Sequence, residues 1–151
     1  MKINFIQNQE LTDNEIIVNV ESKEYSEEVK NIMASIDNKD RGQDILAING
    51  PDKIFTISVE QIIAIEIWKN ELTFLNVDGK YSAKGKLFEV IERLNSDDFV
   101  QVSKSSVINL NHLQYLEASF SGNMLAVLNN DVKETVSRRY LANLKMRLGV
   151  K

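Results

Sequence analysis

The chain contains few side chains that could carry out catalysis, and they do not combine into a catalytic or metal-binding pattern. It has no cysteine, which excludes disulfides, thiolate metal ligands and cysteine nucleophiles, and His112 is its only histidine. No glycine-rich phosphate loop occurs, and Asp97-Asp98 is the only adjacent acidic pair after residue 44. We therefore expect no enzymatic activity, no small-molecule substrate, no metal site and no cofactor.

Basic side chains are the second candidate for chemistry, because they can bind phosphate groups. The net charge of −4 argues by itself against a nucleic-acid partner. Residues 1–43 hold 5 basic and 9 acidic side chains, however, and so carry all of this charge. Residues 133–151 hold six basic side chains against one acid, and residues 99–116 contain Lys104 and no acid. These charges are either a scattered, solvated set or a surface for a polyanion.

The first 43 residues are expected to form two strands and a helix. Ile3–Ile6 and Glu15–Val20 are apolar-rich segments joined by a polar turn, a pattern typical of strands. The next apolar residues recur at helical spacing: Tyr25, Val29, Ile32, Met33 and Ile36. A polar, glycine-containing break at Asn38–Gln43 coincides with the change in charge. We therefore predict an N-terminal ββα extension at residues 1–43 and a second domain at residues 44–151.

The second domain is expected to be mainly β. Short apolar segments are separated by turn signals such as Asn49-Gly50-Pro51 and Asp78-Gly79, the latter a two-residue hairpin signal. The expected strands are 45–49, 54–59, 61–68, 72–77, 80–83, 100–103, 107–110, 113–120, 124–128 and 133–136. One short helix is expected at 87–94, and a last helix is expected between Ser137, whose hydroxyl can cap it, and Gly149. The absence of regularly alternating helices argues against a doubly wound α/β fold.

Several short motifs are weak separately but specific in their order. The segment F-V-Q-V-S-K-S-S-V-I-N-L at residues 99–110 follows the expected helix after a short turn. The segment V-S-R-R-Y at residues 136–140 comes after a further hairpin, and a strand ending near Ile65-Glu66 and a D-G-K-Y hairpin at Asp78–Tyr81 precede both. Together they resemble the LytTR-type DNA-binding domain of bacterial transcription regulators, over about two-thirds of the chain.

The resemblance implies an elongated, antiparallel, multi-sheet fold that inserts loops, and no recognition helix, into successive major grooves of DNA. It further implies a sequence-specific transcriptional regulator that binds direct repeats in promoters. Three loops would carry the contacts, and by position they are Trp68-Lys69-Asn70, Ser103-Lys104-Ser105 and Ser137-Arg138-Arg139. The first loop departs from the family pattern, because Glu71 would repel phosphate.

The chemistry of these side chains agrees with the roles that the resemblance implies. Arginine can make a bidentate contact with guanine, and Arg139 is the candidate for base contact. Lysine and serine suit phosphate oxygens, which favours Lys104 and its flanking serines for the DNA backbone, together with Arg138 near a helix N-terminus. Trp68 either stacks on a base or packs at the edge of a strand, the commoner role of a single tryptophan. We expect Asn109 to close a turn through its side-chain amide.

Forty-three residues are too few for a phosphoacceptor receiver domain, so the sequence resembles a stand-alone, response-regulator-like, cytoplasmic protein. The partners implied are double-stranded DNA, a second copy of the chain on DNA, and a small membrane regulatory protein. One alternative of a different class stays open, a protein-interaction module that acts as an antagonist or adaptor of a regulator without strong DNA binding. The net charge of −4 and Glu71 favour that alternative.

Overall fold

The computed structural model describes residues 1–13, 15–41 and 45–150 of the chain. The chain divides into two compact units, residues 1–42 and residues 43–151, and each is described by itself. Of the predicted polar break at Asn38–Gln43, residues 38–41 belong to a helix and residues 42–43 lie outside the described residues. No helix in the described part is long and apolar enough to cross a membrane.

Within its described residues, the first unit contains one regular element, helix α1 at Glu27–Arg41. The Ser26 hydroxyl accepts a hydrogen bond from the Val29 backbone N–H at 3.3 Å, and Glu27 and Glu28 occupy the first turn, where negative charge is favourable. The predicted helix is therefore confirmed. It begins two residues after Tyr25, the first residue of the predicted apolar face, and runs beyond Ile36.

The two strands predicted in this unit are wrong, because residues 1–13 and 15–26 contain no strand. Their apolar side chains lie in solvent, with Phe5 91% exposed and Ile16 86% exposed. Alternating apolar residues indicate a strand only where a second layer covers them, and an isolated two-stranded hairpin is at best marginally stable in water. The N-terminal extension is thus one helix preceded by irregular chain.

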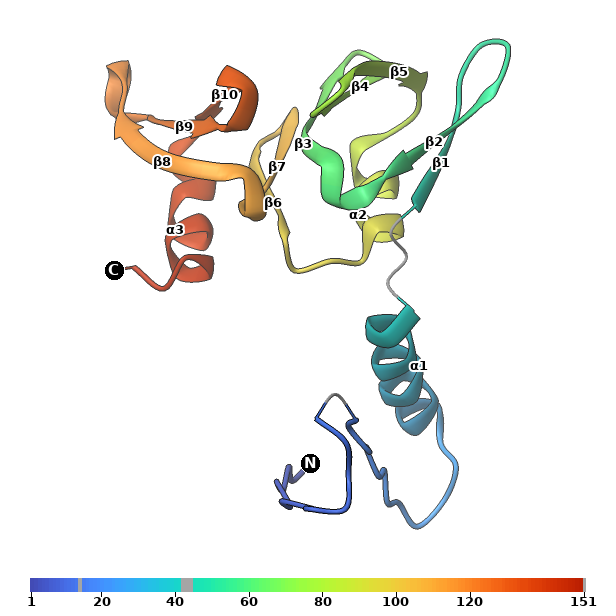
Figure 1. The fold of residues 1–151 in the computed structure, drawn as a ribbon. Coiled ribbons are helices and arrows are strands. Elements are labelled where there is room, and N and C mark those ends of the chain that lie inside the picture. Colours follow the sequence, from blue (N-terminus) through green and yellow to red (C-terminus); the bar gives the residue numbers. More distant parts are fainter. Residues whose placement is uncertain (14, 42–44, 151) are drawn as a thin grey trace. The chain divides into compact units, whose positions relative to one another are not determined.

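The second unit is built from antiparallel sheets, as predicted (Figure 1). A five-stranded sheet has the order β5-β4-β3-β7-β6, a three-stranded sheet has the order β10-β9-β8, and β1 and β2 form a separate hairpin. The strands are β1 Ile45–Asn49, β2 Ile54–Ser58, β3 Ile62–Trp68, β4 Glu71–Asn76, β5 Gly79–Lys84, β6 Phe99–Ser103, β7 Ser106–Asn109, β8 Leu113–Ala118, β9 Met124–Leu128 and β10 Lys133–Val136. All ten predicted strands of this unit are present, with ends that differ from the prediction by at most two residues.

Two helices complete the second unit, α2 at Leu87–Leu94 and α3 at Arg138–Arg147. Short 3-10 turns occur at Val59–Gln61, Leu110–His112, Phe120–Gly122 and Asn129–Asp131. Helix α3 ends as predicted, because Gly149 adopts a φ of +72° and the N–H of Val150 donates to the Lys145 carbonyl at 2.9 Å. The β4–β5 hairpin differs by one residue from the prediction: Asn76 pairs with Gly79, so Val77 and Asp78 form its loop.

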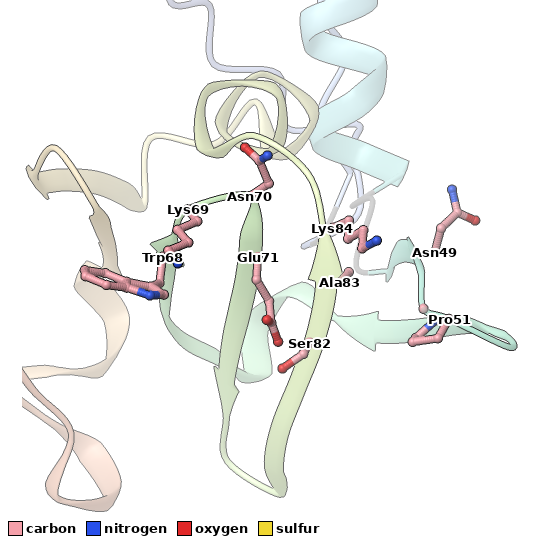
Figure 2. Close-up of a pocket in the computed structure, with 10 residues that line it drawn as sticks. Asn49, Pro51, Trp68, Lys69, Asn70, Glu71, Ser82, Ala83 and Lys84 are labelled. Carbon is pink, nitrogen blue, oxygen red and sulfur yellow. The ribbon is translucent and has the colours of Figure 1, made fainter.

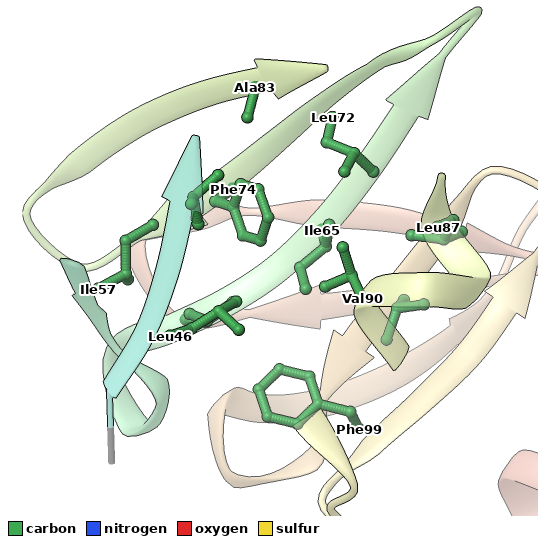
Figure 3. Packing of buried hydrophobic residues seen from close by; sticks show 12 residues of the cluster. Leu46, Ile57, Ile65, Leu72, Phe74, Ala83, Leu87, Val90 and Phe99 are labelled. Carbon is green, nitrogen blue, oxygen red and sulfur yellow. The ribbon is translucent and has the colours of Figure 1, made fainter. Parts of the chain in front are cut away.

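Strand β3 is buried on both faces and divides the hydrophobic core into two clusters. Strict alternation would place Ile63 with Ile65 and Ile67 on one side. A register shift between Ile62 and Ala64 instead sends Ile62 and Ile65 to the first cluster and Ile63 and Ala64 to the second. The first cluster joins the β1–β2 hairpin, the five-stranded sheet and α2 (Figure 3). Its labelled members are Leu46, Ile57, Ile65, Leu72, Phe74, Ala83, Leu87, Val90 and Phe99.

The second cluster holds the five-stranded sheet, the three-stranded sheet and α3 together. Its buried members are Ile63, Ala64, Leu75, Val100, Val102, Ile108, Ala126, Leu128, Val136 and Leu144. Leu144 is the one fully buried side chain among the described residues of α3, and burying a leucine stabilises a fold by about 1.5–3 kcal/mol. This cluster fixes where the beginning of α3 lies relative to β6.

Candidate nucleic-acid interface

The first two predicted DNA-contacting segments lie side by side at one edge of the five-stranded sheet. Strands β3 and β7 pair antiparallel with Glu66 opposite Ser106. The end of β3 is therefore adjacent to the turn that precedes β7. A hydrogen bond of 2.8 Å from the Ile67 N–H to the Ser105 carbonyl extends this pairing. It brings Trp68-Lys69-Asn70 next to Ser103-Lys104-Ser105.

The third predicted segment follows in the same row. The Ser137 N–H donates to the Val102 carbonyl at 2.9 Å, so the junction between β10 and α3 lies beside the end of β6. Helix α3 and strand β10 both pack against β6. Three segments that are far apart in the sequence are thus joined in the order first, second, third by two backbone hydrogen bonds.

The first segment is a tight β3–β4 hairpin turn. Trp68 pairs with Glu71, so Lys69 and Asn70 form the loop, and Lys69 has a φ of +56°. The Trp68 side chain is 78% exposed, and Figure 2 shows its ring projecting away from Glu71 and Ser82. The expectation that Trp68 packs at a strand edge is therefore wrong, and its indole face is available for stacking. The register places Lys84 opposite Glu71, which puts a basic side chain beside the acid that departs from the family pattern.

This turn also borders a hollow on the protein surface. The hollow has a volume of about 990 Å³ and lies between the β3–β4 turn, the β1–β2 turn and β5. Its polar lining includes Lys69, Lys84, Asn49 and Asn70 (Figure 2). The basic character of the first segment therefore extends toward β5.

The second segment is ordered by its own hydroxyl groups. The Ser103 Oγ lies 2.9 Å from the Ser106 Oγ and 3.3 Å from the Ser105 Oγ, and it accepts a hydrogen bond from the Ser105 N–H at 3.2 Å. Lys104 is exposed at the tip and forms no ion pair or hydrogen bond within the described residues. Its ammonium group is therefore available for an external anion.

The third segment begins α3. Ser137 occupies the N-cap position, but its side chain makes no capping hydrogen bond, which corrects the expected hydroxyl cap. Arg138 donates from Nη2 to the Ser121 carbonyl in the β8–β9 turn. Arg139 is exposed and makes no ion pair or hydrogen bond in the part of the chain that the structure describes. Successive helical residues project about 100° apart, so the two arginine side chains point in different directions. The one that points toward the β8–β9 turn, Arg138, is held there, and Arg139 is left exposed.

The β8–β9 turn also belongs to this edge, although it was not among the predicted DNA-contacting segments. Ala118 pairs with Met124, which in turn pairs with Val136, so the turn between β8 and β9 lies at the Ser137 end of the three-stranded sheet. A Cβ atom on Gly122 would overlap Arg138 Nη2, which shows how closely the guanidinium covers this turn. The position of this turn follows from the strand register, which the sequence alone does not specify.

Three polar side chains beneath the row, Glu134, Glu66 and Ser106, were not among the predicted site residues. Glu134 is only 8% exposed, and its Oε1 has no hydrogen-bond partner among the described residues. Burial, the neighbouring Glu66 carboxyl group and its negative charge raise the pKa of Glu134 to about 8, while the Ser106 hydroxyl acts in the opposite direction. The alternation in β10 was an available signal, because it places Glu134 on the same face as the buried Val136.

Two polar residues next to the row have structural roles. Asn109 is 1% exposed; its side chain donates to the Ile62 carbonyl at 2.9 Å and accepts from the Asn111 N–H at 3.0 Å. The prediction that its amide closes a turn is confirmed. His112 bridges the Glu60 carbonyl, at 2.6 Å, and the Asn129 side chain, at 3.0 Å. Within the residues described, no group of three or more histidine and acidic side chains is placed to hold a metal ion.

Residues 52–149 match the LytTr DNA-binding domain family. The chain is 25% identical over 105 residues to the sensory transduction protein LytT of Enterococcus faecalis, covering 70% of this chain and 43% of that protein. It is 27% identical over 105 residues to the transcriptional regulatory protein LytR of Staphylococcus aureus (strain N315), again covering 70% and 43%. The chain thus spans less than half the length of these relatives.

Two further matches concern the whole chain and the fold. An uncharacterized HTH-type transcriptional regulator of Staphylococcus aureus (strain NCTC 8325 / PS 47) is 23% identical to this chain over 150 residues. The match covers 99% of this chain and 99% of that protein. The solved LytTr DNA-binding domain of a methyl-accepting/DNA response regulator from Bacillus cereus superposes with a TM-score of 0.64 at 18% identity, covering 72% of this chain and 99% of that one. With its fold shared and more than half of its residues matched, the chain belongs to the LytTr DNA-binding domain family.

Proposed function

We propose that the chain is a non-enzymatic, cytoplasmic transcription regulator that binds double-stranded DNA in a sequence-specific manner. The three segments at residues 68–70, 103–105 and 137–139 act as one surface. The domain family and the names of the relatives, LytT and LytR, support DNA-binding regulation.

One observation carries the proposal. Three loops from different parts of the chain form a continuous row, and each offers an exposed basic or aromatic side chain that the described protein does not itself engage. A solvated scatter of charge, the other interpretation of the basic residues, does not require the segments to be joined by backbone hydrogen bonds. A row of loops with basic tips matches what a phosphate backbone and base edges offer along a groove.

Within the row, each side chain has a distinct role in the proposal. Arg139 reads a guanine through a bidentate contact, because its guanidinium is exposed at the beginning of α3. Lys104 and the Ser103 and Ser105 hydroxyls contact phosphates, which set register without reading sequence. Trp68, Lys69 and Asn70 engage the neighbouring groove. Arg138, engaged with Ser121, supports the surface and contacts the DNA backbone with its remaining N–H groups.

Binding to direct repeats, one chain per half-site and each half-site read in successive major grooves, is the finer part of the proposal. The test begins with selection of duplexes from a random-sequence pool by the full chain. Hydroxyl-radical footprinting on the selected duplex then locates the protected positions. We expect two protected half-sites in the same orientation and an affinity that falls steeply with salt. If selection enriches no sequence at low salt, the proposal fails.

A second candidate function is an interaction module that binds a protein and only weakly binds DNA. The observation that favours it lies in the first unit, where Ile3, Phe5, Ile6 and Ile16 are more than four-fifths exposed in a segment that carries the chain's entire net charge. A small membrane regulatory protein would be a partner of the expected kind. Titration of a random duplex at two salt concentrations separates the two functions, because an interaction module shows no salt-dependent DNA binding.

A further inference from the structure

A cluster of two acidic side chains and one serine, of which Glu134 and Ser106 are buried and Glu66 is half-buried, lies next to the three proposed DNA-contacting segments. Glu66 comes two residues before Trp68, Ser106 directly follows Ser105, and Glu134 comes three residues before Ser137. The cluster therefore contains one residue from the strand next to each segment. Glu66 and Ser106 are opposite one another in the β3–β7 pairing, and the Glu134 carboxyl group interacts with both.

The cluster continues into the second segment through hydroxyl groups. Ser106 Oγ lies 2.9 Å from Ser103 Oγ, and Ser103 Oγ accepts from the Ser105 N–H at 3.2 Å. Ser106, which influences the Glu134 carboxyl group, is thus linked through Ser103 to the backbone of the turn that carries Lys104. A change in the charge of Glu134 changes the hydrogen-bond acceptors and donors available to these hydroxyl groups.

Among the residues that the structure describes, no positive charge compensates Glu134. Strands β6, β7 and β9 have the sequences FVQVS, SVIN and MLAVL and carry no ionisable side chain. Strand β3 contributes Glu66, and Lys133 on β10 itself lies on the opposite, exposed face. The basic residues of α3, Arg138 and Arg139 among them, do not shift the pKa of Glu134, whereas Glu66 and burial raise it.

We propose that Glu134 is a positioning residue for DNA binding: its proton allows two carboxyl groups to sit together beneath Ser103–Ser105, and loss of that proton weakens binding to DNA. This inference rests on the proposed function. The physical reason is twofold. Two ionised carboxylates in a poorly solvated site repel one another and disturb the hydroxyl chain that orders the turn. The second negative charge also lies beneath the surface that has to approach the phosphates.

The expected loss of DNA affinity follows from the pH at which Glu134 loses its proton. A group that is protonated in the complex and has a pKa of about 8 in the unbound protein weakens binding about tenfold for each pH unit above that value. Between pH 7 and pH 9 the dissociation constant should therefore rise by up to about tenfold. Affinity falls as the pH rises, because the form of the protein with Glu134 protonated is the one that binds DNA.

The experiment measures the dissociation constant of the full chain for a fluorescent duplex selected by the wild-type protein, at several pH values from 6.5 to 9. The test variant is Glu134→Gln, which keeps the volume and the hydrogen-bonding capacity of a protonated carboxyl group. The matched control is Glu117→Gln, which removes one negative charge from an exposed position of the three-stranded sheet. Glu66→Gln is a second test variant, because it removes the other charge of the pair.

We expect wild type and Glu117→Gln to lose affinity in parallel above pH 7.5, and Glu134→Gln to bind as tightly as wild type does at pH 7 and to keep this affinity at pH 9. Glu66→Gln should move the loss of affinity to lower pH and make it smaller, because the Glu66 carboxyl group raises the pKa of Glu134 and repels its ionised form. An equal loss in wild type and Glu134→Gln would overturn the inference, as would weak binding by a folded Glu134→Gln at pH 7. Failure of the wild-type chain to select any duplex would instead refute the proposed function.

Discussion

Replacing Glu134 by glutamine should make the fold more stable at neutral and alkaline pH, without any DNA present. In the unfolded chain the carboxyl group titrates near its ordinary value of 4.5, and in the folded protein its pKa is about 8. The folded state therefore binds one more proton than the unfolded state between these values. By linkage, the free energy of unfolding falls as the pH rises through this window, by at most about 1.4 kcal/mol per pH unit.

Across the whole window the wild-type protein should lose at most about 5 kcal/mol of stability through this one group. The stability contribution is fully present below about pH 4.5 and is lost as the pH rises to about 8. Glutamine cannot ionise, so the stability of Glu134→Gln does not fall with pH for this reason. We expect the variant to match wild type near pH 5 and to exceed it by about 2–3 kcal/mol at pH 8, after allowance for partial solvation of the site.

Urea denaturation at pH 5, 6.5 and 8, followed by tryptophan fluorescence and far-ultraviolet circular dichroism, measures this difference. Glu117→Gln is the control, because its side chain is exposed and its stability should follow that of wild type at each pH. A stability difference between Glu134→Gln and wild type that is the same at pH 5 and pH 8 would refute the reasoning. It would mean that Glu134 is ionised in the folded protein throughout this range.

Three further substitutions test the interface and its support. Lys104→Ala should weaken binding to all duplexes about equally and lower the slope of log affinity against log salt by about one unit, as measured by titration at several salt concentrations. Arg139→Ala should lose about 1–3 kcal/mol of discrimination at one or two base pairs and have the melting temperature of wild type. Arg138→Ala should keep discrimination but have a lower melting temperature, since it loses the contact with Ser121. The reverse result would exchange the roles of the two arginines. Asn109→Ala should destabilise the fold by about 2–4 kcal/mol in urea denaturation, because it leaves the Ile62 carbonyl and the Asn111 N–H without their partner.

Most of the second unit could be predicted from local sequence. Turn signals such as Asn49-Gly50-Pro51 and the alternating strands between them specify the hairpins directly, since each strand pairs with a neighbour in the sequence. Local signals also gave the ends of α3, where Gly149 adopts the left-handed conformation. These features depend on a few adjacent residues and so survive without knowledge of the tertiary structure.

The errors arise where a segment depends on distant partners. Ile3–Ile6 and Glu15–Val20 have the pattern of strands, but the structure provides no sheet for them to join. Strict alternation in β3 would place Ile63 and Ile65 on one side, and the register shift between Ile62 and Ala64 sends them to different clusters. Trp68 is at the end of this strand and is exposed, because the strand extends beyond the core that would have covered it.

The candidate site could be predicted only in part for the same reason. The three segments were identified by resemblance to a family, and their side-by-side arrangement follows from two long-range backbone hydrogen bonds, which no local pattern encodes. The engagement of Arg138 by the β8–β9 turn and the meeting of Glu66 with Glu134 likewise depend on how the two sheets pack. Whether the nine residues of the row contact DNA stays a prediction.

The most direct test of the central proposal is a map of the backbone amide resonances of the full chain during titration with the selected duplex. We expect the largest shifts at residues 67–70, 103–105 and 137–139, and none in β1, β2 and α2. A duplex of scrambled sequence should shift the Lys104 amide but not that of Arg139. Shifts concentrated in residues 1–36, or spread over the β1–β2 hairpin with the row unchanged, would refute DNA binding by the row.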